Sequence, residues 1–338
     1  MRHVAVVILN WNGRDMLRRF LPSVIDCSGD AEVVVADNGS TDGSLDLLAS
    51  EFPGVRVVAL DKNHGFAEGY NLALRQVEAD YYVLLNSDVE CTPGWIEPVV
   101  DMMECEPRVA VAQPKLMMYD CKDTFEYAGG AGGFIDRYGY PFCRGRLFST
   151  LEKDSGQYDD ERDIFWATGA CMFVRSDVWR EVGGLDGDFF AHMEEIDFCW
   201  RVMLAGYRVR YCPSSRVYHV GGGTLPKSSP FKTELNFRNN LSMLYKNLPA
   251  GRRGRVLALR MWLDRVAAVK FLMEGHVGEY RAVRKAHREF RNRRGRLDEK
   301  RMKNGTMTVP QIYGGWLLPE YYLLRRRRFS DLKGQFSR

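Results

Sequence analysis

Short apolar runs alternate with helix-like segments over the first 115 residues, and this alternation most constrains the fold. The apolar runs cover residues 4–9, 33–36, 55–60, 81–85 and 109–112, and the segments with helical periodicity cover 15–25, 44–51, 66–78 and 95–104. Strands that alternate with helices favour a parallel sheet that is covered on both faces. The sequence therefore predicts an α/β fold.

Polar clusters follow four of these strands. They are Asn10-Trp11-Asn12-Gly13, Asp37 to Ser44, Asn63-His64-Gly65-Phe66, and Asn86-Ser87-Asp88. Because ligands of open α/β sheets bind at the carboxyl ends of the strands, we expect these clusters to line one edge.

Asp37 and Asp88 are the acidic residues at this edge. Asp88 is well placed for a divalent cation, since Mg²⁺ usually takes one or two protein carboxylates and leaves the other positions to substrate. Asp37 could accept hydrogen bonds from a base or ribose, and the N–H groups that follow it could bind a nucleotide. Each Asp, taken alone, could equally be a turn or helix-cap residue.

Three carboxylates, Glu194, Glu195 and Asp197, open a helix that we expect to run to Ala205. Acidic residues in a first turn stabilise a helix through its dipole, which is the simpler interpretation. Carboxylates that lie together also raise one another's pKa, as a general base requires. Farther on, His219 could be a second metal ligand or a buried structural histidine.

The charge is divided between an acidic body and a basic tail. Residues 231–338 carry 26 Lys and Arg against 9 Asp and Glu, a net +17, which leaves 22 against 35, a net −13, for residues 1–230. Two prolines and a glycine run near residue 225 suggest a boundary, so we predict a catalytic unit over 1–230 and a basic, mainly helical region over 231–338. Such a tail could meet an anionic surface or pack internally against the acidic body.

The eight cysteines form no Cys-x-x-Cys pair, and no apolar run approaches the roughly 18 residues of a membrane-spanning helix. We expect a cytoplasmic protein that could lie on the inner face of the cell membrane. Residues 256–263, and 321–324 with Arg325 to Arg328, combine apolar, aromatic and basic side chains as interfacial helices do.

Together these segments resemble family two glycosyltransferases of the GT-A fold, especially a bacterial rhamnosyltransferase-like branch that builds surface polysaccharide. The resemblance covers about residues 3 to 224. It implies a Rossmann-like nucleotide-binding sheet. Residues assigned to the nucleotide by this resemblance and by the strand-end pattern are Asn10, Asn12, Asp37, Asn63, Gly65 and Asn86.

The resemblance also assigns the metal and the base. Asn86-Ser87-Asp88 matches the Asp-x-Asp motif with Asn in the first place, so Asp88 is the safer ligand, and His219 matches a His near the metal. The Glu-Asp pair of the family aligns with Glu194-Glu195, which makes Glu195 the expected base, while Glu194 and Asp197 stay open.

The expected activity is an inverting, metal-dependent transfer of a sugar from a UDP- or dTDP-linked donor to a saccharide or lipid-linked acceptor, with Mg²⁺ or Mn²⁺ as cofactor. One alternative is sugar-phosphate nucleotidyl transfer, which the absence of a Gly-rich, Arg-containing loop after the first strand disfavours. Another is nucleic-acid or glycan binding through the tail. We consider nucleic acid an unlikely partner, because it leaves the strand-end clusters without a role.

Overall fold

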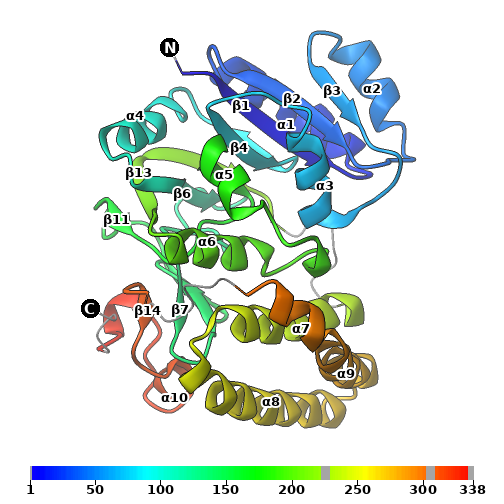
Figure 1. Ribbon diagram of the computed structural model, residues 1–338. Coiled ribbons are helices and arrows are strands. Elements are labelled where there is room, and N and C mark those ends of the chain that lie inside the picture. Colours follow the sequence, from blue (N-terminus) through cyan, green and yellow to red (C-terminus); the bar gives the residue numbers. More distant parts are fainter. Residues whose placement is uncertain (1, 222–228, 302–308, 334–338) are drawn as a thin grey trace.

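A central mixed sheet organises the chain, and the structure, a computed structural model, describes residues 2–221, 229–301 and 309–333. Within these residues nine strands form the sheet in the order β11-β13-β6-β12-β4-β1-β2-β3, with β5 paired to β13 (Figure 1). The strands are β1 (Val4–Asn10), β2 (Glu32–Asp37), β3 (Arg56–Ala59), β4 (Tyr81–Asn86), β5 (Val89–Cys91), β6 (Val109–Met118), β11 (Arg162–Asp163), β12 (Cys171–Arg175) and β13 (Arg208–His219).

Helices cover both faces of this sheet and continue into a layer below it (Figure 1). They are α1 (Arg14–Cys27), α2 (Ser44–Glu51), α3 (Gly65–Leu74), α4 (Glu97–Cys105), α5 (Ser176–Val182), α6 (Glu194–Leu204), α7 (Pro230–Asn247), α8 (Ala250–Met273), α9 (Val277–Glu299) and α10 (Leu317–Tyr322), with short 3₁₀ turns at Gly187–Phe189 and Phe329–Asp331.

Strand β1 shows why the sheet is covered on both sides. Its side chains alternate between the two faces, as those of any strand do. Ala5 and Val7 belong to a core with residues of α3, α5 and α6, whereas Val6 and Ile8 belong to a second core with residues of α1, α2 and α4. The predicted double coverage is therefore confirmed.

The prediction of a parallel sheet is right for β3-β2-β1-β4 and wrong beyond β4. These four strands pair in parallel, with Asn10 opposite Asp37 and Leu9 opposite Asn86. Strand β12 then enters antiparallel between β4 and β6, so β6 is not a neighbour of β4. The apolar run of β12 was visible in the sequence, but its direction depends on the long segment before it, which brings the chain back to the edge where β4 and β6 end, so that β12 runs in the opposite direction.

Strand β6 is longer than its apolar run predicts, because polar side chains continue it in the interior. Gln113 and Lys115 are buried, and Lys115 forms ion pairs with Asp154, at 2.7 Å, and with Asp159. The side chain of Gln113 accepts a hydrogen bond from the Thr168 N–H at 3.0 Å. These partners come from later parts of the chain, so the sequence near β6 does not reveal them.

Residues 117–163, whose content of Gly, Tyr, Asp and Arg with little helical periodicity predicts a hairpin or lid, form most of a second, smaller sheet. Its order is β10-β9-β8-β7-β14. The strands are β7 (Gly133–Asp136), β8 (Pro141–Cys143), β9 (Arg146–Leu147), β10 (Thr150–Leu151) and β14 (Ile312–Tyr313). Strand β14 comes from the basic region and pairs in parallel with β7, so that region returns to the body after its helices.

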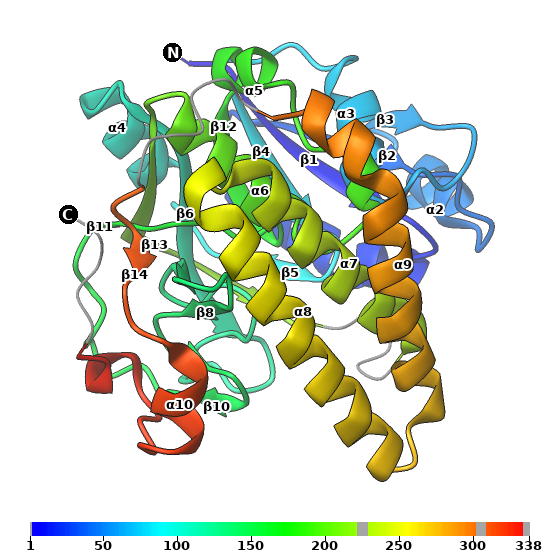
Figure 2. The ribbon, with the colours of Figure 1, turned by 60° about the horizontal axis from the view of Figure 1, so that its bottom comes forward.

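Helices α7, α8 and α9 lie together in one layer, with α10 at the same end of the molecule (Figures 1 and 2). Helix α7 packs against both α9 and α6. No helix of the described ranges combines the length and apolar content that crossing a membrane requires.

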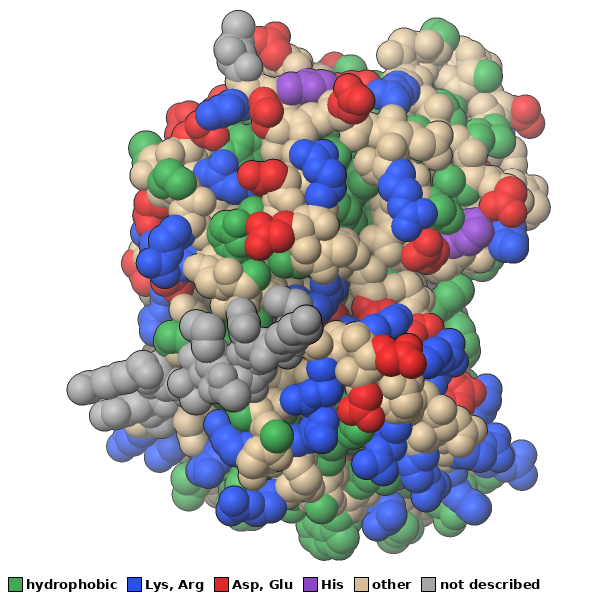
Figure 3. Space-filling view, in the orientation of Figure 1, with side chains coloured by type: hydrophobic (Ala, Val, Ile, Leu, Met, Phe, Trp, Pro, Cys, Tyr) green, Lys and Arg blue, Asp and Glu red, His purple; other side chains and the backbone are tan. Residues whose placement is uncertain are grey.

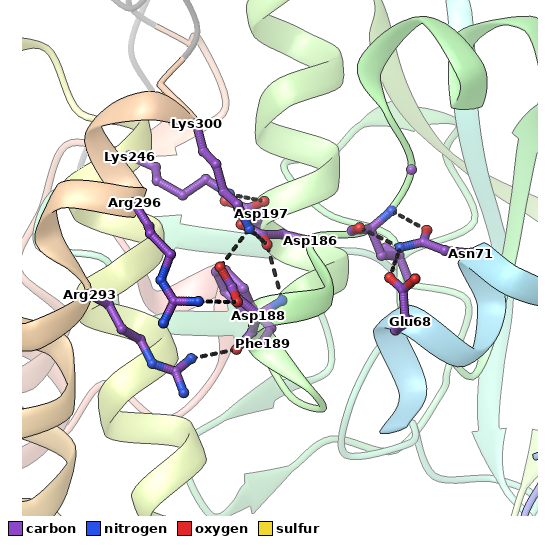
Figure 4. A network of polar contacts seen from close by, with 12 residues as sticks. Glu68, Asn71, Asp186, Asp188, Phe189, Asp197, Lys246, Arg293, Arg296 and Lys300 are labelled. Carbon is purple, nitrogen blue, oxygen red and sulfur yellow. Dashed lines mark hydrogen bonds and ion pairs between the residues drawn. The ribbon is translucent and has the colours of Figure 1, made fainter. Parts of the chain in front are cut away.

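Buried ion pairs join this layer to the body (Figure 4). The Lys246 ammonium lies 2.6 Å from Asp186 and 3.0 Å from Asp197, and all three side chains are buried. Lys300 lies 2.6 Å from both Asp186 and Asp188. Part of the positive charge of the tail is therefore neutralised internally by the acidic body.

Replacing Lys246 with Ala should lower the free energy of unfolding by about 3 kcal/mol, because it leaves two buried carboxylates short of a cation. The measurement is the midpoint and slope of chemical denaturation. Lys270→Ala is the matched control, since this lysine is exposed and lies 3.6 Å from one exposed glutamate, so its loss should change stability by less than about 0.5 kcal/mol. Equal effects of the two substitutions would contradict a structural role for the buried pairs.

Candidate functional site

Asn10 and Asp37 meet at the carboxyl ends of β1 and β2. Both are buried, and the Asn10 amide donates to Asp37 Oδ2 at 3.0 Å and to Ser40 Oγ at 3.2 Å. Asp37 Oδ1 accepts the Ser40 N–H at 2.9 Å. Among the described residues Asn10 Oδ1 has no hydrogen-bond partner. The pair therefore fixes the loop after β2 and leaves one buried acceptor unused.

Asn12 ties the loop after β1 to the loop after β2. Its N–H donates to Ser40 Oγ at 2.9 Å, and its side-chain oxygen accepts the Thr41 N–H at 2.8 Å. Asn12 has a φ of +51°, a left-handed conformation that Asn tolerates better than most residues. The structure thus brings Asn10, Asn12 and Asp37 together, as predicted for one binding edge.

Asn63 and Gly65 lie beside this edge and make internal contacts. Asn63 Oδ1 accepts the Gly65 N–H at 2.8 Å and a bond from the Asn38 amide at 3.2 Å. The N–H groups of Phe66 and Ala67, which begin α3, donate to the Phe190 carbonyl at 2.7 and 3.1 Å. A loop of the protein therefore occupies the helix N-terminus that the resemblance places near the diphosphate.

Gly65 is required by that loop. Its φ is +79°, and a Cβ here would lie 2.5 Å from the Phe190 ring and 2.7 Å from the Phe190 carbonyl oxygen. Only glycine allows this close approach. Gly65 therefore positions Phe190.

Asp88 and His219 form the centre of a buried polar cluster. His219 Nε2 lies 3.1 Å from Asp88 Oδ1 and 3.3 Å from the Asn86 amide nitrogen, and His219 Nδ1 lies 3.3 Å from Glu126 Oε1. Burial favours a raised pKa for Asp88, but the hydrogen bond and charge of His219 outweigh it and hold that pKa below its usual range. Burial likewise disfavours a charged His219, yet Glu126 and Asp88 raise its pKa to about 10.

The donor set of this cluster fits a hard divalent cation. The described residues contain no group of three or more His, Cys, Asp or Glu side chains placed to hold a metal ion. Asp88 Oδ1 and His219 Nε2 face each other, and His219 becomes a donor once a cation displaces the proton that its raised pKa retains. Glu126 contacts the other ring nitrogen, as carboxylates commonly do behind a ligating histidine. Asp88 supplies the oxygen ligand that Mg²⁺ and Mn²⁺ favour, and these ions usually keep positions for substrate phosphates.

Sequence reasoning missed Glu126. It is buried, and its N–H donates to the Leu116 carbonyl while its carboxylate accepts the Ala128 N–H at 2.5 Å. It lies in the region expected as a lid, outside any motif. Its position in that region was the one feature of the sequence that could have marked Glu126 as a site residue.

The three carboxylates at the start of α6 have different surroundings. Asp197 is fully buried, and its oxygens accept from Arg201 at 2.9 Å, Lys246 at 3.0 Å and Asn247 at 2.8 Å. Glu194 is buried and Glu195 is half-buried, and each has a buried Oε2 without a hydrogen-bond partner among the described residues. Among these three carboxylates, those of the two glutamates therefore keep an oxygen without a hydrogen-bond partner in the described residues.

Burial raises the pKa values of both glutamates, but to different extents. It raises the pKa of Glu195 to about 7, against hydrogen bonds from backbone N–H groups that favour the charged form. Burial, and then the negative charge of Glu195, raises the pKa of Glu194 well above the usual value. Burial therefore favours the protonated form of Glu194, and a pKa of about 7 lets Glu195 accept a proton near neutral pH, as a general base requires.

The loop just before Glu194 and Glu195 has a strained backbone. Phe190, His192 and Met193 all have φ near +70°, and they are three of the six non-glycine residues with positive φ in the described part of the chain. The Asn239 amide of α7 holds the loop by donating to the carbonyls of Phe189, Ala191 and His192 at 2.8 to 2.9 Å. Backbone strain held by surrounding contacts is typical of functional sites.

His192 and Asn239 are further residues that the sequence did not single out. Burial, with the charge of Lys232 adding to it, lowers the pKa of His192 to about 4, so its imidazole is neutral. Its Nε2 is buried and has no hydrogen-bond partner among the described residues. His192 lies within the acidic segment already noted, but Asn239 belongs to a helix without any recognisable motif.

Contacts connect the start of α6 to the strand-end edge. The Phe190 carbonyl binds the start of α3, and the Ala167 N–H lies 3.4 Å from the Cys199 sulfur of α6. Three residues after Ala167, the Ala170 carbonyl accepts the Asn86 N–H at 3.0 Å. These contacts link α6 and the loop before it to α3 and to the end of β4.

This chain belongs to glycosyl transferase family 2, whose family model matches residues 5–183, and it is a glycosyltransferase. It is 27% identical over 229 residues to the N-acetylglucosaminyl-diphospho-decaprenol L-rhamnosyltransferase of Mycobacterium tuberculosis, in an alignment that covers 63% of this chain and 75% of that protein. The family resemblance seen in the sequence is confirmed.

Solved structures confirm the predicted GT-A type of fold. GalNAc-T7 with UDP, GalNAc and Mn²⁺ superposes with a TM-score of 0.59 at 17% identity, over 74% of this chain and 49% of that one. Staphylococcus aureus TarS 1–349 in complex with UDP-GlcNAc superposes with a TM-score of 0.56 at 16% identity, over 89% of this chain and 84% of that one. At these identities the similarity concerns the fold alone.

Replacing Gly65 with Ala should displace Phe190 and the glutamate-bearing loop, and so lower both stability and the rate of sugar transfer. We expect a loss of about 2 to 3 kcal/mol in the free energy of unfolding. Gly183→Ala is the matched control, because Gly183 has a φ of +80° but nothing within 4 Å of its Cβ position, so it should cost only about 1 kcal/mol. Thermal or chemical denaturation would distinguish them, and equal losses would contradict the role of the Phe190 contact.

Proposed function

We propose that this protein transfers a sugar, with inversion, from a nucleotide diphosphate donor to a saccharide or lipid-linked acceptor in the synthesis of a cell-surface glycan. The observation that carries the proposal is the pair Glu194 and Glu195, whose unpartnered carboxyl oxygens lie at the start of a helix that contacts link to the end of β4, where Asp88 and His219 meet. The acceptor class rests on the name of the mycobacterial relative, which acts on a diphospho-decaprenol sugar. The donor base, UDP or dTDP, stays open.

Glu195 is our choice for the general base. Asp197 is disfavoured because Arg201, Lys246 and Asn247 already use its oxygens. Glu194 is disfavoured because it is the more buried of the two glutamates, and burial raises its pKa and favours the protonated form, which could donate a hydrogen bond to the acceptor. Glu195 is half-buried, and burial raises its pKa to about 7, so it can accept a proton near physiological pH.

The proposed reaction is a single displacement. Glu195 takes the proton of an acceptor hydroxyl as that oxygen attacks the anomeric carbon, and the bond from that carbon to the diphosphate oxygen breaks. Asp37, Asn10, Asn12 and Asn86, with Asn63 and Gly65 shaping the neighbouring loop, form the expected nucleotide side. Asp88 and His219 would hold Mg²⁺ or Mn²⁺, which supplies neutralisation of the charge that develops on the leaving diphosphate.

Glu195→Gln should lower kcat by roughly 10²-fold to 10⁴-fold and leave donor binding almost unchanged, because the amide cannot take the proton. Glu194→Gln should retain most of the rate, since an amide resembles the neutral carboxyl form that burial favours at this position. Steady-state transfer and nucleotide-sugar binding would be measured for both variants. The reverse ranking would assign the base to Glu194.

The pH dependence tests the same residue. A base whose pKa is about 7 is mostly protonated below that pH, so kcat should fall about tenfold for each pH unit below it. A rate that stays flat from pH 5 to pH 8, with denaturation showing a folded protein, would remove Glu195 from the role.

Asp88→Ala should abolish metal-dependent binding of a nucleoside diphosphate. The measurement is calorimetric binding of a panel of nucleoside diphosphates with and without Mn²⁺. Asp26→Ala, an exposed carboxylate on α1, is the control and should bind as the unmodified protein does. If metal-dependent binding persists without Asp88, the proposed cation site is wrong.

A further inference from the structure

The outer surface of α8 carries an apolar stripe that no described part of the chain covers. Trp262, Val266, Val269 and Met273 are exposed by 56, 50, 51 and 77%. They recur at intervals of three and four residues, so they share one side of the helix. The opposite side, with Val256, Leu257 and Ala268, is buried. The interfacial character expected for residues 256–263 therefore lies mostly farther along the helix.

A basic groove adjoins this stripe. It has a volume of about 550 Å³ and lies between α8 and α9. Its cationic lining residues are Arg265, Arg281, Arg284, Lys285, Arg288 and Arg291. Val269 lines the groove and also belongs to the stripe, so the apolar and basic surfaces are continuous.

Most of these cations lack an acidic partner. Lys285 pairs with Glu234 at 2.9 Å and lies 3.8 Å from Glu289. Within the described residues none of the five arginines of the groove forms an ion pair. Arg291 donates to the His287 carbonyl at 3.2 Å, and Arg284 lies 5.8 Å from the centre of the Tyr280 ring. Five arginines without ion pairs beside one groove create a positive potential that favours an anionic partner.

A second exposed apolar segment lies at the same end of the molecule. Tyr322, Leu323 and Leu324, at the end of α10, are exposed by 59, 78 and 60% and precede Arg325. Tyr140 lies between this segment and α8. The guanidinium of Arg260, a residue of α8, lies 3.6 Å from the centre of the Tyr140 ring. Burial is the main cause of the raised pKa of Tyr140, and the charge of Tyr322 adds to it. In Figure 3 the hydrophobic side chains along the lower end of the molecule lie among Lys and Arg side chains.

We propose that the stripe of α8 and the arginine groove between α8 and α9 together bind the surface of an anionic lipid bilayer. The apolar side chains would enter the boundary between headgroups and acyl chains, and the groove would receive lipid phosphates. Apolar area joined to unpaired cations is the combination that holds helices in the plane of an anionic membrane. A nucleic acid would be attracted to the arginines, but it gives the exposed aliphatic side chains nothing to contact.

Vesicle flotation with the full chain tests this surface without any substrate, so its outcome is independent of the proposed sugar transfer. Vesicles of phosphatidylcholine with phosphatidylglycerol should bind the protein, and vesicles of phosphatidylcholine alone should bind it far more weakly. Arg284→Gln with Arg288→Gln should weaken binding to the anionic vesicles roughly 30-fold, about fivefold for each lost cation. Trp262→Ser should weaken it by about fivefold or more.

Matched controls are exposed residues of the body. Arg19→Gln with Arg75→Gln removes two exposed arginines, and Ile25→Ser removes an exposed apolar side chain of α1. Both should bind vesicles as the unmodified protein does. Equal binding to neutral and anionic vesicles would overturn the proposal, and so would equal loss in test and control variants. Binding to DNA or RNA in preference to anionic vesicles, or a dimer whose interface buries Trp262, would also overturn it.

Discussion

The buried contact between Lys246 and the carboxylates of Asp186 and Asp197 connects the helical layer to the chemistry. Asp197 lies in the first turn of α6 with Glu194 and Glu195, and Asp186 begins the loop that leads to them. A buried ammonium with two carboxylate partners at 2.6 and 3.0 Å has little freedom to move, because separating the charges in the interior is costly. The orientation of α6 therefore depends on a lysine of α7, about 50 residues later in the chain.

The same layer holds the backbone that presents the glutamates. Asn239 and Arg238, neighbours on α7, both donate to the Phe189 carbonyl at 2.9 Å, and Asn239 continues to Ala191 and His192. These bonds help to hold three residues with positive φ, whose strain costs of order 1 to 3 kcal/mol each. A helical layer packed beside the central sheet thus helps to fix the carboxylates at the start of α6.

Sequence patterns predicted what depends on local periodicity and on strand ends. The apolar run of β4 and the polar residues after it placed Asp88 correctly at the edge of the sheet, and His219, over 130 residues away, does lie 3.1 Å from it. The sequence could not predict the direction of β12 or the buried partners of Lys115, since both depend on contacts between distant segments. Glu126 and Asn239 escaped notice for the same reason. Each acts through one side chain whose neighbours come from elsewhere in the fold.

The two sides of α9 show why net charge alone did not settle the role of the basic region. Arg293, Arg296 and Lys300 recur at intervals of three and four residues and face the body, where Lys300 and Arg296 meet Asp188 at 2.6 and 3.6 Å. Arg281, Arg284, Arg288 and Arg291 recur at the same intervals on another side, beside α8 and without ion pairs in the described residues. Counting charges adds the two sets together. Their position on the helix separates them, because Arg293, Arg296 and Lys300 already have partners in Glu289, Asp186 and Asp188, whereas the second set carries its charge outward.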